Sequence, residues 1–127
     1  MRLYDVAVAS LALRVDRKWL DNVLSQHDVP GVSRSVRGAA RQIPLRSLLI
    51  ISLVRDLQRQ LGLGVARGLV VAARLIGVSH GHVRLGIALL SVDIPALERQ
   101  LDDRLVDVME TIVPRRRGRP RAGGRRA

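Results

Sequence analysis

The sequence predicts a mainly α-helical fold: a winged helix-turn-helix with a short β-hairpin wing, an additional C-terminal helix and a disordered basic tail. Aromatic residues make up only 2% of the chain, so the core must consist of Leu, Val, Ile and Ala, which favours helices over a β-sandwich. Two short amphipathic segments precede an Arg-bearing stretch with many turn residues. We therefore expect a helix-turn-helix part over residues 1–77, a strand and acidic helix over residues 78–113, and a tail over residues 114–127.

The first two helices are marked by their N-terminal caps. A carboxylate directly before an apolar periodic segment can accept a hydrogen bond from the free N–H groups of the first helical turn. Asp5 stands before residues 6–13 and Asp16 before residues 17–26. The sequence thus predicts two short helices joined by a tight turn near Val15.

The second helix, residues 17–26, has one apolar and one polar face. Leu20, Val23 and Leu24 are spaced i, i+3 and i+4, so we expect them to face the core. Trp19 is interpreted as a packing residue rather than a base-stacking one. Arg and Lys suit guanine acceptors and Asn suits adenine, so the polar face is a candidate for docking in the major groove of DNA, the alternative being an ordinary solvated face. The residues of this face are Arg17, Lys18, Asp21, Asn22 and Ser25.

The next segment has the pattern of a β-hairpin, the predicted wing. Residues 29–32 indicate a turn and then a strand, residues 35–38 a turn, and residues 40–43 a return strand. Cationic side chains on such a hairpin would contact the sugar-phosphate backbone, which sets affinity more than specificity. The wing arginines are Arg34, Arg37 and Arg41.

Two longer apolar segments follow. Pro44 suits the first turn of a helix that ends near residue 61, and residues 48–54 are apolar nearly all round, so this helix should be the hub of the core. Residues 64–76 predict a further helix that is stopped by Gly77. Helix ends and close packing explain the intervening glycines better than a nucleotide-binding loop does, because no Gly-Lys-Ser/Thr sequence is present. These glycines are Gly62, Gly64 and Gly68.

Several of these features together carry a family resemblance. They are Val15 and Leu20 of the turn and second helix, Gly38 and Arg41 of the wing, and Ile43-Pro44 before Leu48-Leu49 of the next helix. On these residues, the segment 8–76 resembles the DNA-binding domain of the mercury-resistance-regulator (MerR) type. The resemblance implies a transcriptional regulator that binds double-stranded DNA, with a helix-turn-helix, an Arg-bearing wing and a further helix pair, and it implies dimerisation through a C-terminal helix.

Residues 83–89 alternate between apolar and other side chains, which predicts one strand. A lone strand needs a partner. It could pair with the wing, with another part of the chain, or with the same strand of a second subunit, and the pattern does not choose between them.

The last helix is predicted from Pro95 to about Ile112, with Asp93 as its cap. Its apolar stripe either completes the core or forms the seam of a homodimer. Its other face is acidic, which would repel DNA and could dock a basic protein partner. The stripe comprises Leu97, Leu101, Leu105, Val108 and Ile112. The acidic face comprises Glu98, Asp102, Asp103, Asp107 and Glu110.

The tail is strongly cationic: residues 115–127 hold seven arginines and no acidic residue. A segment of Arg, Gly and Pro cannot bury enough apolar surface to fold, so we expect disorder when it is free. Its Arg-Gly-Arg-Pro sequence resembles an AT-hook core, which implies insertion into an A/T-rich minor groove; undirected phosphate binding is the alternative. The residues expected to contact DNA are Arg115, Arg116, Arg117, Gly118, Arg119, Pro120 and Arg121.

Other chemistry has little support in the sequence. The absence of cysteine excludes disulfides, thiolate metal sites and cysteine nucleophiles, and it agrees with a reducing cytoplasm. We expect a cytoplasmic, nucleoid-associated location. His80 and His82 lack a nearby carboxylate, so they predict a turn with exposed histidines rather than a metal site. We expect no catalytic activity and no cofactor. The longest uncharged apolar runs, 47–54 and 85–92, are too short to span a bilayer.

The formal charge of +11 suits a polyanionic partner. We predict a sequence-specific DNA-binding regulator that acts as a dimer. One alternative is an antitoxin-like protein that masks a partner protein through residues 83–112. Another is a non-specific nucleoid-associated or RNA-binding protein, which would bind unrelated duplexes equally well.

Overall fold

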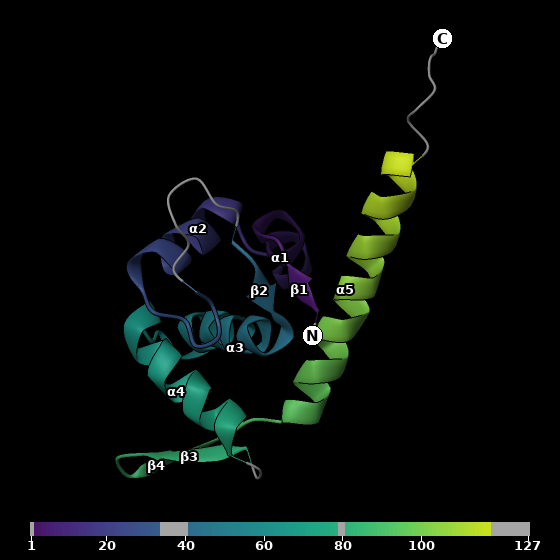
Figure 1. The fold of residues 1–127 in the computed structure, drawn as a ribbon. Helices are drawn as coiled ribbons and strands as arrows, with labels where there is room; N and C mark the ends of the chain where they lie inside the picture. The colour runs from purple at the N-terminus through teal and green to yellow at the C-terminus, as the bar shows by residue number, and fades with distance from the viewer. Residues whose placement is uncertain (1, 34–40, 79–80, 118–127) are drawn as a thin grey trace.

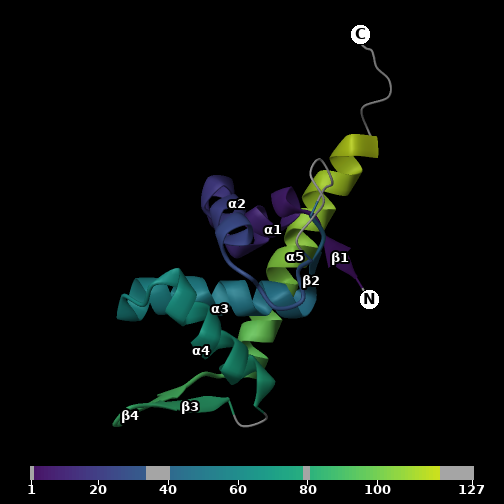
Figure 2. The ribbon, with the colours of Figure 1, turned by 60° about the vertical axis from the view of Figure 1, so that its left-hand side comes forward.

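The computed structural model describes residues 2–33, 41–78 and 81–117, and the side chains of these ranges as far as residue 111. The described residues are mainly helical, as predicted, with five helices and two antiparallel pairs of short strands. Helix α3 (Leu45–Leu61) crosses the middle of the molecule. In both Figure 1 and Figure 2, α1 and α2 lie on one side of α3, whereas α4 and the β3–β4 hairpin lie on the other.

Helices α1 (Val6–Leu13) and α2 (Arg17–Gln26) have the predicted bounds and caps. The Asp5 carboxylate accepts a hydrogen bond from the Val8 backbone N–H at 2.8 Å, and the Asp16 carboxylate accepts one from the Lys18 N–H at 3.0 Å. Arg14 ends α1 in the left-handed region, with φ of 57°. The expected tight turn between two helices is therefore present.

Residues 29–32 were predicted as a turn followed by a strand; the turn is present, but no strand follows it as far as residue 33. The Val32 N–H donates to the Val29 carbonyl at 3.0 Å instead of to a neighbouring strand. Gly31 takes a φ of +88°, and a Cβ there would collide with the Ser47 hydroxyl. That hydroxyl is buried and donates to the Pro30 carbonyl at 2.6 Å, so the turn is anchored to α3.

The predicted return strand, residues 40–43, is wrong in both bounds and partner: of its described residues, only Ile43 lies in a strand. Strand β2 (Ile43–Pro44) pairs antiparallel with β1 (Leu3–Tyr4), with Tyr4 opposite Ile43 and Leu3 opposite Pro44. The side chains of Tyr4 and Ile43 are both buried. Pairing with the N-terminal residues is favoured because it places these two side chains in the core.

The core centres on α3, as predicted from its apolar character. Eight of its residues are buried, including Leu48, Ile51 and Val54. Helix α4 (Val65–Gly77) packs against it, and Gly68 lies so close that an added Cβ would be 3.3 Å from Val54. Gly62 ends α3 with a φ of 70°. Close packing and helix termination thus account for these glycines, in agreement with the prediction.

The prediction of a single strand over residues 83–89 is wrong. The chain instead forms a hairpin from β3 (His82–Leu85) and β4 (Ala88–Ser91), in which Val83 faces Leu90 and Leu85 faces Ala88. The two-residue loop begins with Gly86 at φ +64°. A positive φ at the first loop residue matches the twist of the flanking strands, so the segment can turn on itself.

Helix α5 (Ile94–Arg117) begins where the Asp93 carboxylate accepts a hydrogen bond from the Ala96 N–H at 3.0 Å, as predicted. Leu97, Leu101 and Leu105 are buried, and α5 packs against α1 and also contacts α3. Within one chain, this part of the stripe therefore completes the core. The side chain of Ile112 lies outside the described part.

The C-terminal end of α5 lies beyond its predicted end at residue 112. The helix continues through Pro114 to Arg117, so the first residues of the expected tail are helical rather than disordered. Because Pro114 has no N–H, the hydrogen bond to the carbonyl four residues earlier is missing, and the helix nevertheless continues for about one more turn. Residues 118–127 lie outside the described ranges.

Among the helices of the described residues, none combines the length and the apolar character that crossing a membrane would require.

Arg104 lies on α5, near Arg14 at the end of α1 and Asp56 of α3. Partial burial lowers the pKa of its guanidinium, the charge of Arg14 lowers it further, and Asp56 acts in the opposite direction. An arginine keeps its proton at neutral pH despite such a shift. The side chain thus remains a cation where α5 meets the end of α1 and helix α3.

Candidate nucleic-acid interface

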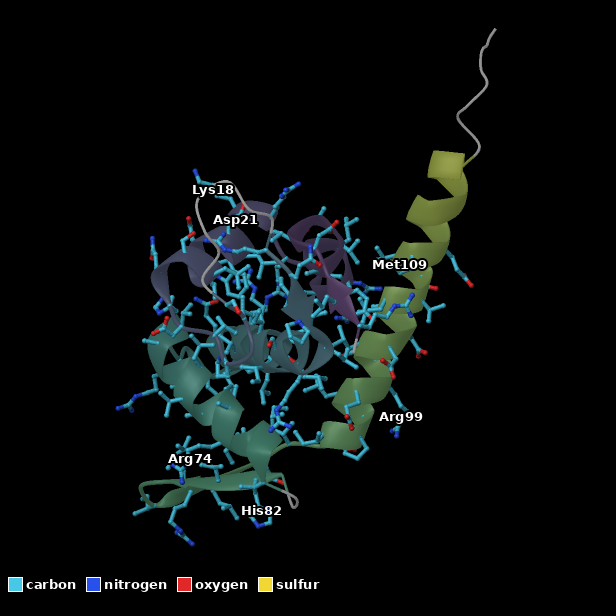
Figure 3. All side chains as sticks on the ribbon, in the orientation of Figure 1. Lys18, Asp21, Arg74, His82, Arg99 and Met109 are labelled. Carbon is cyan, nitrogen blue, oxygen red and sulfur yellow. The ribbon has the colours of Figure 1, made fainter. Side chains whose placement is uncertain are left out.

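The polar face of α2 lies in solvent. Arg17, Lys18, Asn22 and Ser25 are exposed and Asp21 is half-buried. Figure 3 shows Lys18 and Asp21 at the outer edge of the molecule, on the side away from Arg74 and His82. The opposite face of the helix is held in the core by Leu20, Val23 and Leu24. The inward and outward faces are those that the sequence predicts.

One wing arginine joins this face. The Arg41 guanidinium is half-buried and donates a hydrogen bond to the Ser25 hydroxyl at 3.2 Å. The same hydroxyl donates to the Asp21 backbone carbonyl at 2.7 Å. A guanidinium has five N–H donors, so Arg41 retains donors for a phosphate while it is held against α2. The structure therefore brings Arg41 together with the predicted residues of α2.

The remaining predicted residues lie outside the described residues or have no described side chain. Arg34 and Arg37 of the wing lie outside the described residues, as do Gly118, Arg119, Pro120 and Arg121 of the tail. The backbone of Arg115, Arg116 and Arg117 forms the last turn of α5.

Trp19 fixes α2 on α3. Its ring is half-buried against the core, and the Arg55 guanidinium carbon lies 4.9 Å from the ring centroid, which is cation–π geometry. Arg55 also donates to the side-chain oxygen of Gln58 at 3.0 Å, whereas its buried Nε has no hydrogen-bond partner in the described part of the chain. Trp19 is a packing residue, as predicted.

We expect the Trp19–Arg55 contact to contribute about 0.5–2 kcal/mol to the free energy of unfolding. Single substitutions would mix this contribution with changes in packing and in the burial of Nε, so a double-mutant cycle of Trp19→Leu and Arg55→Met is required. Urea unfolding followed by circular dichroism measures the coupling energy. The matched cycle of Trp19→Leu with Arg59→Met should give a value near zero. Equal values in both cycles would contradict the contact.

The histidines give no support to a metal site. His82 is the exposed first residue of β3, and His80 lies outside the described residues. No group of three or more His, Cys, Asp or Glu residues in the described ranges is placed to hold a metal ion.

The sequence interpretation missed a second cationic region between α4 and the β3–β4 hairpin. A groove of about 630 Å³ is lined there by three arginines and by apolar side chains. Part of this region could have been predicted from the sequence, because two of the arginines lie seven residues apart on one predicted helix. The third arginine lies on a hairpin that was not predicted. The lining residues are Arg67, Val70, Val71, Arg74, Arg84, Leu85 and Gly86.

Comparison with known proteins adds no relative: no protein-family model, no curated protein and no solved structure matches this chain.

Proposed function

We propose that this protein binds double-stranded DNA through the outer face of α2 and acts as a transcriptional regulator of the MerR-like kind. The observation that carries the proposal is the α1–turn–α2 unit, in which a capped second helix is fixed by buried leucines while Arg17, Lys18 and Asn22 face solvent. An α-helix fits the major groove, where such side chains can reach base edges.

Two further features support this proposal. Arg41 is held at the C-terminal half of α2 by Ser25, which places a third cation beside the same face, where a phosphate would flank the groove. Trp19 and Arg55 join α2 to the α3 hub, so the helix is presented on a rigid support. A rigid support lowers the entropy lost on docking.

The proposal predicts both a steep salt dependence and a sequence preference. With about six phosphate contacts, a plot of log binding constant against log salt concentration should have a slope of about −5. Selection from random duplexes with the full chain should enrich a defined motif. A competition gel-shift assay should then show that unrelated duplexes compete poorly.

Equal competition by unrelated duplexes would contradict the regulator and favour the non-specific nucleoid alternative. A salt slope near zero would contradict DNA binding through charged side chains altogether.

A further inference from the structure

The groove between α4 and the β3–β4 hairpin combines cations with an apolar floor. On α4, Arg67, Val71 and Arg74 are spaced i, i+4 and i+7, so they share one face of the helix. Val71 is buried, whereas both arginines are exposed. Figure 3 shows Arg74 where α4 approaches the hairpin. This face of α4 therefore forms one wall of the groove.

Both walls contribute apolar surface. Val70 of α4 keeps 61% of its surface in solvent, and Leu85 of β3 is half-buried on the other wall. The hairpin also places Arg84 and Gly86 in the lining, and none of the lining residues is acidic. Apolar surface left in water is favourably covered by an apolar ligand, and the surrounding charge selects an anionic one.

The arginines of α4 are available to a ligand. Within the described ranges, neither Arg67 nor Arg74 forms a hydrogen bond or an ion pair. A guanidinium presents five N–H donors in a planar fork that matches the oxygens of a carboxylate or a phosphate. At about 1.5 Å per residue, the two side chains leave the helix about 10 Å apart, with Val70 and Val71 between them. An anionic group at one end of this stretch thus leaves room for an apolar body beside the valines.

The dimensions of the groove suit a small molecule. Its volume of about 630 Å³ lies within the range of about 300–1,000 Å³ that is usual for small-ligand sites. Such sites are mostly apolar, with a few polar groups that fix the orientation of the ligand. The phosphates of a nucleic acid would use the arginines but would gain nothing from Val70, Val71 and Leu85.

We propose that this groove binds a small amphipathic organic anion, with a flat apolar body that carries one carboxylate, sulfonate or phosphate group. The body covers Val70 and Leu85, and the anionic group pairs with Arg74 beside the hairpin. Arg67 and Arg84 add positive potential from the two walls.

This inference goes beyond the proposed DNA binding and rests on other residues. Lys18 and Asp21 of the α2 face lie at the opposite side of the molecule from Arg74 in Figure 3. Binding of a small anion is measured without DNA, so failure of either proposal leaves the other standing.

Heteronuclear NMR of the full-length protein locates the binding. The probe is naphthalene sulfonate, whose rings supply the apolar body and whose sulfonate supplies the charge. A ligand of this size should bind with a Kd of about 1 mM or below, and saturable shifts should concentrate at the backbone amides of α4 and β3. Shifts confined to other elements, or no saturation at about 10 mM, would overturn the proposal.

Two further ligands distinguish an amphipathic site from simpler ones. Neutral naphthalenemethanol has the body without the charge, and inorganic sulfate has the charge without the body. Each should bind at least about 10-fold more weakly than naphthalene sulfonate, because each lacks one part of the interaction. Equal binding of either ligand overturns the proposal, since the groove would then be an apolar patch or a general anion site.

Substitutions at exposed positions test the arginines without disturbing the core. Arg74→Ala should weaken the binding of naphthalene sulfonate by about 5-fold and Arg67→Ala by about 2-fold, since screening limits exposed charge pairs. The double variant should lose about 10-fold. The matched control is Arg99→Ala, which removes an exposed arginine on α5, far from Arg74 in Figure 3, and should leave the Kd unchanged. A loss for Arg99→Ala equal to that for Arg74→Ala overturns the proposal.

Competition identifies the class of ligand. We expect neither a DNA duplex nor an acidic peptide of alternating Glu and Leu to displace naphthalene sulfonate from the amides of α4 and β3. Displacement by either one would assign the groove to a macromolecule and overturn the proposal.

Discussion

Replacing Leu20 with alanine is expected to lower the free energy of unfolding by about 2–5 kcal/mol, the largest stability effect that we predict. Leu20 is 0% exposed and holds the inner face of α2 against the core. Truncation removes apolar contacts and leaves a cavity that the surrounding helices fill only in part. Urea unfolding at fixed temperature measures the change.

The matched control is Leu11→Ala in the neighbouring helix α1. Leu11 is 56% exposed, so the same chemical change there should alter the free energy of unfolding by no more than about 0.5 kcal/mol. Similar losses at both positions would show that the inner face of α2 is not packed as described.

The second large effect is expected on DNA binding. The double substitution Arg17→Ala with Lys18→Ala should weaken binding to the selected duplex by about 10- to 1000-fold, because one bidentate arginine contact to a base is worth about 1–3 kcal/mol. If both side chains also neutralise phosphates, the salt slope should fall in magnitude by about 2. Fluorescence anisotropy with labelled duplex at several salt concentrations measures both quantities.

The control is Arg2→Ala with Arg99→Ala, which removes the same formal charge. Arg2 borders α5 beside Asp102 and Glu110, and Arg99 lies on α5, far from Lys18 in Figure 3. This variant should keep the affinity within about 3-fold, since screening limits the reach of exposed charges to about 8–10 Å. Equal losses in both double variants would mean that net charge, rather than the face of α2, drives binding.

The sequence predicts the local features of the fold well. The bounds of α1 and α2 follow from Asp5, Asp16 and the spacing of the apolar residues, since a cap and a helical stripe both depend on neighbours within one or two turns. The outward face of α2 follows from the same spacing. The close approach at Gly68 was also expected.

Pairings between distant residues were not predictable in the same way. Strand β1 has only two residues and no alternating pattern, so nothing local indicated that Tyr4 would lie opposite Ile43. In the predicted wing, Gly31 was interpreted as part of a turn, but its anchoring through Ser47 depends on a helix that begins 14 residues later. The hairpin turn at Gly86 was hidden because Leu85, Ile87 and Leu89 continue the alternation across it.

The candidate site also combines a feature that is local in the sequence with features that depend on distant residues. The α2 face was predicted from one helix, whereas Arg41 was assigned to phosphate contact without its link to Ser25. Arg41 and Ser25 are 16 residues apart in the sequence, so this hydrogen bond depends on the tertiary fold that brings the chain back to α2. The groove between α4 and the β3–β4 hairpin could not be predicted either, because one of its walls is formed by a hairpin that the sequence did not indicate.

The pairing of β1 with β2 has a consequence for how this architecture can vary. Residues 3 and 44 are opposite each other in the ladder, so the chain between them leaves and re-enters the remainder of the protein at one place. Segments whose ends are close together tolerate exchange between proteins. Swapping the whole stretch, both strands included, would exchange α1 and α2 while α3, α4 and α5 stay unchanged, provided that the exchanged residues keep the packing of α1 against α5 and α3.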